Sequence, residues 1–331
     1  MTRSLSLLLA GTAAAALSGA AAAAQDQLTV GYFLEWPMPF LAAKADGTYD
    51  EALGMPVNWV AFETGTAMSA AMASGDVQIS VSQGVPPFVV AASAGQPLVA
   101  LDVAVSYSDN DNCVVATARE IDKDSASELE GATVAVPMGT AAHYGFLRQM
   151  DHFGVPLDSL EIVDMAPTDG AAALAQGAVD MACGYGGGLT RMKEHGNVLL
   201  TGQEKEDLGI LVFDVTSAPQ AFVAENPDLV AAFLGVTAEA NAAWNAGEGK
   251  DEMLQKIAAE SGMSPEATAE AIATMQFPPI EAQLSPKWMG GAAQTFMKGV
   301  ADVFVAAGSI DSALDSYEAA VDTGPLAAAA D

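Results

Sequence analysis

The residue types that most often carry enzyme chemistry are few in this sequence, and their spacing matches no common catalytic motif. The three histidines, His143, His152 and His195, lack the His-Glu-x-x-His or Cys-x-x-Cys spacing of many zinc sites. A Gly-x-Ser-x-Gly nucleophile elbow and a lysine-containing phosphate loop are both missing. We therefore expect ligand binding without turnover, with no metal and no cofactor, and we keep a secreted enzyme as a lesser alternative.

Polar and aromatic side chains gather instead in five loops, each leading toward an expected helix. Helix starts present unpaired N–H groups and the positive end of the helix dipole, which suit carboxylate or sulfonate oxygens. Aromatic faces can hold the methylene or ammonium end of a small amine. The loops span residues 34–40, 64–66, 82–87, 138–144 and 184–188. The candidate ligand-binding residues are Glu35, Trp36, Gly65, Thr66, Gln83, Thr140, Ala141, His143, Tyr144, Tyr185 and Asp214.

Each of these candidates also has an ordinary structural role as its alternative. Thr66 and Thr140 are placed to cap helices with their hydroxyls, whether or not they touch a ligand. Trp36 is the strongest aromatic candidate because it lies in a loop rather than in an apolar run. Asp214 is flanked by apolar residues on an expected strand and could pair with a ligand ammonium. A hydrogen bond to hinge backbone is the alternative for that carboxylate.

A weak internal duplication indicates which elements position the loops. Residues 65–77 and 167–179 correspond at a constant offset of 102, and each predicts an alanine-rich helix, a glycine stop and a strand. Apolar runs upstream also correspond, at 28–32 and 57–62 in the first unit and at 132–136 and 160–165 in the second. Each half therefore predicts a β-α-β-α-β order and a mostly parallel sheet. The alternative is that any α/β protein repeats such units.

The remaining segments predict how the chain passes between two lobes. A strand at 113–116 should carry the chain into the second lobe, and a strand at 209–215 should return it. Helices are expected at 227–246, 251–262, 265–275, 286–307 and 310–320. The predicted α/β fold thus has a discontinuous first lobe, residues 26–113 plus 215–331, and an inserted second lobe, residues 114–214. The ligand cleft should lie between the lobes at a two-segment hinge.

Residues 1–24 have the pattern of an export signal. Arg3 precedes a leucine- and alanine-rich stretch, which ends in Ala22-Ala23-Ala24. The alternative is a membrane anchor, although the alanine-rich segment barely reaches the length that a spanning helix needs. Removal of the signal would leave about 307 residues (331 minus 24), enough for one large or two medium domains. We expect this mature chain to be free in a periplasm.

Charge and cysteine content bear on partners and compartment. The formal net charge is −30, from 42 acidic and 12 basic residues. Such a surface repels phosphate backbones, so we expect no nucleic-acid partner, whereas a zwitterionic ligand would feel little net force. The only cysteines are Cys113 and Cys183. They could form one disulfide in an oxidising compartment, with two buried free thiols as the alternative.

Four stretches of the sequence resemble the taurine-binding proteins of the aliphatic sulfonate, nitrate and taurine ABC importer family. They are residues 63–66 leading to 73–79, residues 134–137 leading to 143–144, residues 180–185 and residues 213–215. The resemblance spans most of the mature chain. It implies a two-lobed periplasmic binding protein fold of type II, which captures taurine or a related small alkyl sulfonate. It also implies an ABC permease in the inner membrane as partner.

The resemblance assigns roles to several candidates. In that family the sulfonate is typically held at helix starts and the amine by an acidic residue. Asp214 would then lie at the amine, and Thr66, Thr140 and the following amides would lie near the sulfonate, with His143 beside them.

The sequence departs from the family pattern in two places. Ala141 and Ala142 stand where taurine binders often have hydroxyl residues, and Tyr185 begins a glycine run where they tend to have tryptophan, alanine and proline. Backbone amides could replace the lost hydroxyls. A second ligand class therefore stays open: glycine betaine caged by Trp36, Tyr144 and Tyr185, or a thiamine-precursor pyrimidine.

Overall fold

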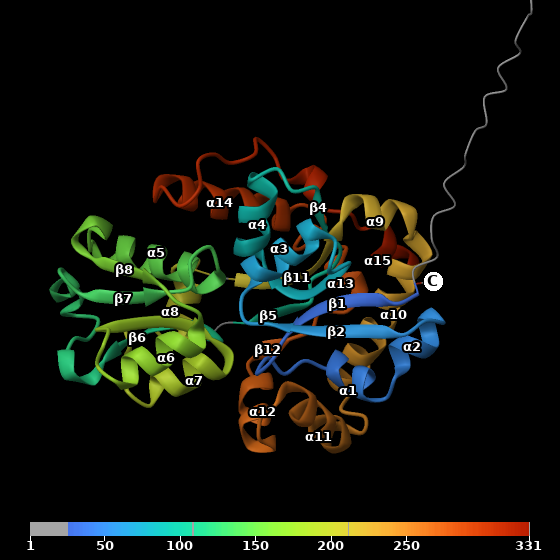
Figure 1. Cartoon of the computed structure of the whole chain (residues 1–331), viewed down its shortest axis with the longest axis horizontal. Helices are drawn as coiled ribbons and strands as arrows, with labels where there is room; N and C mark the ends of the chain where they lie inside the picture. Colours follow the sequence, from blue (N-terminus) through green and yellow to red (C-terminus); the bar gives the residue numbers. More distant parts are fainter. Residues whose placement is uncertain (1–25, 108, 211, 331) are drawn as a thin grey trace, which may run out of the picture.

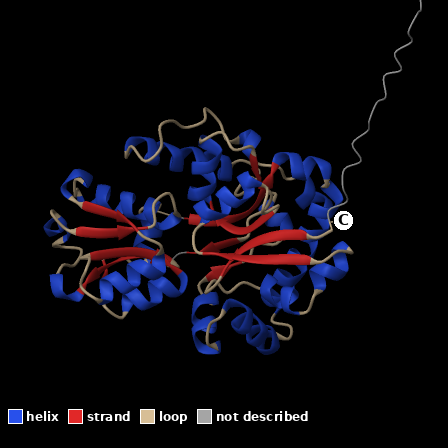
Figure 2. Cartoon of the chain, viewed as in Figure 1, coloured by secondary structure: helices blue, strands red, loops and turns tan. Residues whose placement is uncertain are grey.

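The computed structural model describes residues 26–330 except 108 and 211, and it folds them into two α/β lobes (Figure 1). The expected export signal, residues 1–24, lies outside the described residues. Within the described part of the chain, one sheet has seven strands and the other has five, and helices cover both sheets (Figure 2). The prediction of two α/β lobes is confirmed.

The sheet of the first lobe is built around β1 (Leu28–Phe33), which pairs in parallel with β2 (Val57–Phe62) and β3 (Ile79–Gly84). Helices α1 (Phe40–Ala45) and α2 (Thr48–Leu53) connect β1 to β2. Helix α3 (Gly65–Ser74) connects β2 to β3, and α4 (Val85–Ser93) follows β3 directly. Because parallel strands end at one edge of a sheet, the loops after β1, β2 and β3 meet there.

The second lobe repeats this arrangement. Strand β7 (Thr133–Val136) pairs in parallel with β8 (Glu161–Asp164) and β9 (Met181–Tyr185). Helices α5 (Ala141–Phe153), α6 (Pro167–Ala175) and α7 (Gly186–Lys193) follow β7, β8 and β9 in turn. The order β2-β1-β3 in one sheet thus corresponds to β8-β7-β9 in the other. The predicted β-α-β-α-β order is confirmed in both halves.

Each parallel core is extended by an antiparallel strand on which the chain enters or leaves a lobe. Strand β6 (Asp111–Ala116) pairs with β9 and β10 (Gly196–Val198) in the second lobe. Strand β11 (Val212–Pro219) pairs with β3, β4 (Leu98–Ala100) and β5 (Val105–Tyr107) in the first. Helix α8 (Gly202–Asp207) precedes β11. The strands β6 and β11 therefore begin three residues before the expected boundaries at 113/114 and 214/215.

The two cysteines lie opposite each other on adjacent strands. Cys113 of β6 and Cys183 of β9 occupy paired positions in the register, and they form a disulfide. The disulfide prediction is confirmed, and the alternative of two buried free thiols is wrong.

The C-terminal segment returns to the first lobe as helices. They are α9 (Gln220–Glu225), α10 (Pro227–Ala246), α11 (Lys250–Ser261), α12 (Pro265–Ile272), α13 (Ile280–Gln283), α14 (Ala292–Ala306) and α15 (Gly324–Ala328). No helix of the described residues has both the length and the apolar character needed to cross a membrane. Short 3₁₀ turns complete the chain at Thr117–Arg119, Ala126–Leu129, Leu157–Ser159 and Glu318–Ala320.

Three of the expected C-terminal helices differ from the structure. The helix predicted to reach Met275 ends at Ile272, because Met275 and Gln276 form β12 and pair with β5. The helix expected from residue 286 begins only at Ala292, after two consecutive glycines. The prediction of a helix at 310–320 is wrong. Tyr317 in that segment is buried and hydrogen-bonds Ser93 (2.6 Å), which ties the segment to α4 instead.

An aromatic cluster beneath β1 anchors the first loop of the site. The Trp59 ring packs against Tyr32, Phe40, Tyr49 and Phe233. Tyr32 and Phe40 thus belong to the core, although they flank the loop that carries Trp36. With both ends of this loop held by buried rings, the loop itself has a fixed path over the edge of the sheet.

Candidate ligand-binding site

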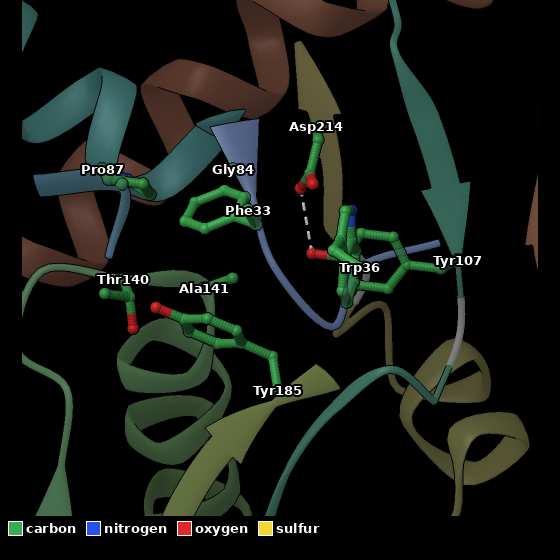
Figure 3. Close-up of a pocket in the computed structure, with 10 residues that line it drawn as sticks. Phe33, Trp36, Gly84, Pro87, Tyr107, Thr140, Ala141, Tyr185 and Asp214 are labelled. Atoms are coloured by element: carbon green, nitrogen blue, oxygen red, sulfur yellow. Dashed lines mark hydrogen bonds between the residues drawn. The ribbon is translucent and has the colours of Figure 1, made fainter. Parts of the chain in front are cut away.

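A small cavity lies between the two lobes, where the strands of each parallel core end (Figure 3). All five loops expected from the sequence contribute to it, together with residues on β1, β5 and β11. Its lining residues are Phe33, Trp36, Gly65, Gly84, Pro87, Tyr107, Thr140, Ala141, Tyr185 and Asp214. Six of them are among the predicted candidates: Trp36, Gly65, Thr140, Ala141, Tyr185 and Asp214.

Asp214 is the charged group of this cavity, and it is held by a short chain of hydrogen bonds. Its carboxylate is 3% exposed and accepts from the Ser82 hydroxyl (2.6 Å) and from the Tyr107 hydroxyl (3.0 Å). The Ser82 oxygen in turn accepts from Trp36 Nε1 (2.9 Å). Ser82 adopts a left-handed backbone conformation with φ of 59°, a strained geometry that recurs at functional sites.

Burial raises the pKa of Asp214 from 3.8 to about 7, although the hydrogen bonds from Ser82 and Tyr107 oppose the shift. The negative charge of Asp111 adds to the rise. Neither lysine nor arginine occurs among the described residues that line the cavity. A ligand ammonium would therefore supply the counter-charge that this carboxylate lacks.

The opposite side of the cavity is formed by helix starts. Helices α3 and α5 begin there, after Thr64 and Thr140, whereas α4 begins after Gly84 beside Asp214 and α7 begins at Gly186 beside Trp36. Figure 3 shows Thr140 and Ala141 on the side of the cavity that faces away from Asp214 and Trp36. The first N–H groups of a helix have no partner inside the helix, and the dipole makes its start positive. The cavity thus has an anionic end and an end suited to bind an anion.

The two threonines expected as caps have different roles. The Thr140 hydroxyl accepts from His143 N (3.4 Å) and donates to the Pro137 carbonyl (2.6 Å), so Thr140 caps α5 as predicted. Thr66 does not cap α3. The cap is Thr64, whose hydroxyl accepts from Ala67 N (3.2 Å), and Thr66 is the second residue of the helix. The cap expected at Thr66 thus lies two residues earlier in the chain.

Gln83 and Thr66 stand behind the cavity wall rather than on it. The Gln83 side-chain amide donates to the Gly65 carbonyl (2.8 Å) and to the Ser69 hydroxyl (2.6 Å), and its oxygen accepts from Ser217 (2.7 Å). These bonds fix the start of α3 against β3. Thr66 faces Gly139 of the other lobe, where a Cβ added to the glycine would come within 3.1 Å of the Thr66 methyl group.

His143 and Tyr144 likewise do not line the cavity. The His143 ring stacks on Phe304 of α14, and its Nδ1 accepts from Gly139 N (3.1 Å). Burial lowers the pKa of His143 to about 4, so the imidazole is neutral at neutral pH. Tyr144 packs edge-on against Phe296 and Phe304. Both residues therefore join α5 of the second lobe to α14 of the first.

Glu35, the remaining candidate, lines a neighbouring outer cavity. Its carboxylate forms a bidentate ion pair with Arg191 of α7, with N···O distances of 2.8 and 3.1 Å. The Tyr185 hydroxyl also crosses between the lobes and donates to the Glu63 carbonyl (2.7 Å). Together these bonds hold the lobes in a closed arrangement.

Four lining residues were absent from the predicted set: Phe33, Gly84, Pro87 and Tyr107. Gly84 and Pro87 lie in the predicted loop 82–87, and Phe33 precedes the loop that carries Trp36. Their positions in the sequence could therefore have identified them as lining residues. The position of Tyr107 could not. It lies on β5, which reaches the site only because β5 pairs with β11 across more than a hundred residues of sequence.

In the part of the chain that the structure describes, no three His, Cys, Asp or Glu side chains gather in a way that could hold a metal ion.

Two α/β lobes joined by two chain crossings, with a cavity at the junction, define the fold of the periplasmic solute-binding proteins. The chain belongs to the NMT1/THI5-like family, whose model matches residues 37–246. A taurine-binding periplasmic protein of Escherichia coli K12 is 31% identical over 195 residues, which are 59% of this chain and 59% of that relative. The match thus spans less than two thirds of the relative, and it confirms the resemblance read from the sequence.

Solved structures share the fold over nearly the whole chain. The alkanesulfonate-binding protein SsuA from Xanthomonas axonopodis pv. citri, bound to MOPS, superposes with a TM-score of 0.74 at 19% identity, covering 90% of this chain and 99% of that one. The periplasmic aliphatic sulphonate binding protein SsuA from Escherichia coli gives a TM-score of 0.69 at 20% identity, covering 88% and 96%. At these identities the likeness is one of fold.

Proposed function

We propose that this protein is the substrate-binding component of an ABC importer, which captures taurine or a related small amino-sulfonate between its lobes in the periplasm. The observation that carries the proposal is the polarity of the inner cavity. A buried carboxylate without a cation, Asp214, faces helix starts that lack side-chain anions. A small zwitterion with an ammonium at one end and a sulfonate at the other satisfies both ends at once.

The relatives support this assignment. The E. coli relative is a taurine-binding periplasmic protein, and the two structural neighbours bind alkyl sulfonates by name. We further propose that residues 1–24 direct export, that the ligand stabilises the closed arrangement of the lobes, and that the closed form docks on an inner-membrane permease. The protein binds its solute without chemical turnover.

Glycine betaine is the second candidate, because four aromatic rings, those of Phe33, Trp36, Tyr107 and Tyr185, line the inner cavity. A quaternary ammonium offers no N–H to Asp214, but it pairs with the carboxylate by charge and with the rings by cation–π attraction. Tyr144, expected as one wall of such a cage, lies against α14 instead. This loss of a wall favours the primary amine.

Thermal unfolding of the purified protein in the presence of taurine, ethanesulfonate and glycine betaine tests the proposal. A ligand at a hundredfold excess over its Kd adds about 2.7 kcal/mol to the free energy of unfolding. We expect the largest rise in Tm with taurine and a smaller one with ethanesulfonate, which lacks the amine. A rise with betaine and none with either sulfonate would reject the sulfonate assignment. Mass spectrometry of the recovered ligand should show it unchanged.

A further inference from the structure

A buried ion pair lies beside the point where the chain crosses between the lobes. Lys205 of α8 and Asp111 of β6 are 2% and 3% exposed, and Lys205 Nζ lies 3.5 Å from Asp111 Oδ1. The same ammonium donates to the Asp111 carbonyl. Asp111 is the first residue of the strand that enters the second lobe, and α8 precedes the strand that returns to the first. The pair therefore joins the two crossing segments on the side of the second lobe.

Asp111 and Asp214 occupy equivalent places in the two lobes. Each lies on the antiparallel strand by which the chain enters its lobe, opposite the end of a parallel strand: Asp111 faces Tyr185 of β9, and Asp214 faces Gly84 of β3. Both carboxylates are buried. Their counter-charges differ, because Asp111 pairs with Lys205, whereas the described residues that line the cavity at Asp214 include no lysine or arginine. The second lobe thus carries its own ammonium where the first lobe would bind that of a ligand.

The two carboxylates lie along one face of α5. Ala141 and Gly145 are one turn apart on that face. A Cβ added to Gly145 would lie 3.4 Å from Asp111 Oδ2. A Cβ added to Gly84 would lie 3.6 Å from Ala141 Cβ and 3.5 Å from Asp214 Oδ1. Burial is the main cause of the raised pKa of Asp214, and the charge of Asp111 adds to it. The geometry thus places Asp111 where its charge acts on the ligand-binding carboxylate.

The other described groups around Asp214 carry no charge in the pH range in which it titrates. The hydroxyls of Ser82 on β3 and Tyr107 on β5 donate to it. Burial raises the pKa of Tyr107 and of Tyr185 well above the ordinary value of 10, and the charge of Asp214 adds to both shifts, so both phenols stay protonated. Helix α4, which begins beside Asp214, has no titratable side chain, although its dipole favours the ionised carboxylate. Among the residues that the structure describes, the buried ion pair is therefore the charged group beside Asp214.

We propose that Lys205 is a positioning residue for the ligand-binding carboxylate: by pairing with Asp111, it favours the ionised form of Asp214, which holds the ligand ammonium. Without the Lys205 cation, the charge of Asp111 would favour a proton on Asp214. A protonated Asp214 would lose the charge-assisted hydrogen bonds to the ammonium. The inference rests on the proposed function for the role of the ammonium, but the charge of Asp214 can be measured without a ligand.

The Trp36 indole reports the charge of Asp214, because its Nε1 donates to Ser82, which in turn donates to Asp214. Heteronuclear NMR of the ligand-free protein can follow this indole N–H between about pH 5 and pH 9, with Trp36→Phe to assign its signal among the four tryptophans. We expect the midpoint to rise by about one pH unit in Lys205→Met and to fall by a similar amount in Asp111→Asn. The double variant, which removes both charges, should have a midpoint close to that of the wild type.

Taurine affinity, measured by calorimetry at about pH 7, should follow these midpoints. It should weaken about fivefold in Lys205→Met, because the ionised fraction of Asp214 falls from about one half to about one tenth. It should recover in the double variant. Lys123→Met is the matched control, since Lys123 pairs with Glu204 of the same helix α8 at the surface (2.8 Å). This variant should change neither the midpoint nor the affinity.

The direction of the shifts separates this role from a structural one. Loss of a purely structural ion pair would weaken binding in both single variants and would not move the midpoint in opposite directions. Unchanged midpoints, or shifts of the same sign, would overturn the inference, while taurine binding by the wild type would leave the proposed function intact. The expected shifts in a protein that does not bind taurine would instead reject the proposed ligand and leave the control of Asp214 by Lys205 standing. If Lys205→Met does not fold, Asp111→Asn and the double variant decide, because equal midpoints in these two would overturn the inference.

Discussion

At the scale of single residues, Asp214 combines a cost to stability with a role in binding. Its pKa of about 7 lies above the ordinary value of 3.8 because the carboxylate is buried. Between these two pH values the folded protein holds a proton that the unfolded chain has released. The free energy of unfolding of the ligand-free protein therefore falls as pH rises through this window, and the stabilisation by the neutral carboxyl is fully present only below it.

Asp214→Asn should remove this pH dependence and weaken an amine-bearing ligand. We expect urea unfolding of the ligand-free variant to show a smaller fall in stability between about pH 6 and pH 7 than the wild type. Taurine affinity at pH 7.5 should drop by about 1.5–3 kcal/mol, because a charged hydrogen bond is lost. In the wild type the affinity should decline as pH falls below 7, since binding then requires loss of the Asp214 proton.

Asp102→Asn is the control for this prediction. Asp102 is another buried carboxylate, with a pKa raised to about 6 by burial, and it accepts from Thr216 N (2.8 Å) outside the cavity. Its replacement should change how the free energy of unfolding depends on pH below pH 6, and it should leave taurine affinity unchanged. Equal loss of affinity in both variants would show that Asp214 acts through the fold rather than on the ligand.

Gly84 sets the floor of the cavity, and a single methyl group there should block it. A Cβ at this position would lie 3.5 Å from Asp214 Oδ1 and 3.6 Å from Ala141 Cβ, which is ordinary contact distance. The backbone at Gly84 has φ of −54°, which alanine adopts without strain. Gly84→Ala should therefore fold normally and weaken taurine at least about tenfold, or about 1.4 kcal/mol, as measured by calorimetry.

Gly235→Ala provides the comparison, since Gly235 lies in α10 with no neighbour within 4 Å of the added methyl. It should leave binding intact and stabilise the helix by about 0.5–1 kcal/mol. Wild-type affinity in Gly84→Ala would mean that the ligand does not approach this part of the cavity.

At the scale of elements, α7 connects the lobes through Arg191. The Arg191–Glu35 pair is bidentate, but its side chains are 42% and 36% exposed, so water screens it. Arg191→Met should favour the open arrangement and weaken ligand binding by about 0.2–1 kcal/mol, which is at most about fivefold. The affinity of the wild type, but not that of the variant, should also fall with added salt. Small-angle scattering of the ligand-free proteins would report the change in shape.

Lys193→Met tests whether this effect is specific to the contact between lobes. Lys193 lies on the same helix with similar exposure and pairs with Asp109 near the chain crossing (3.2 Å). It should leave affinity within about 1.5-fold of the wild type, since it does not reach Glu35. An equal loss in both variants would argue against a specific role for the Arg191–Glu35 pair.

The sequence predicted the elements better than the contacts between them. Residues 57–62 and 227–246 form the strand and helix expected, because apolar residues and Pro227 mark their ends. The strands predicted at residues 77–81 and 179–183 begin two residues later, as β3 at Ile79 and β9 at Met181, since a glycine turn occupies more of the chain than its apolar neighbours suggest. Polar residues at 310–320 gave a helical pattern, but burial of Tyr317 overrode it.

In the site, too, the loops could be predicted from the sequence, but the contacts of their side chains could not. The five loops were recognisable because glycine, proline and hydroxyl residues follow predicted strands, and each loop contributes to the cavity. Which side chain in each loop faces the cavity could not be predicted, as His143 and Ala141 show. They are two residues apart at the start of α5, yet Ala141 lines the cavity and His143 stacks on Phe304. The position of α14, set by distant sequence, decides between them.

At the scale of the whole molecule, the acidic surface should make stability depend on salt. A formal net charge of −30 produces repulsion among exposed carboxylates that compaction increases. Raising NaCl from about 0.01 to 1 M shortens the screening length from about 30 to 3 Å. We expect Tm at pH 7.5 to rise across this range, as followed by circular dichroism. The rise should be smaller near pH 4, where many carboxylates are protonated, and an equal rise at both pH values would contradict this explanation.

The contact between the lobes also restricts which residues can occur together at positions 35 and 187 in related proteins. Gly187 lies directly against the Glu35 side chain, and a Cβ there would come within 2.3 Å of Glu35 Oε2. A side chain at position 187 and a glutamate at position 35 in this conformation therefore exclude each other. In aligned relatives we expect the two positions to change together, with larger residues at 187 found where position 35 has lost its acid. Relatives without this ion pair can then differ in the side chains that line the entrance of the cleft.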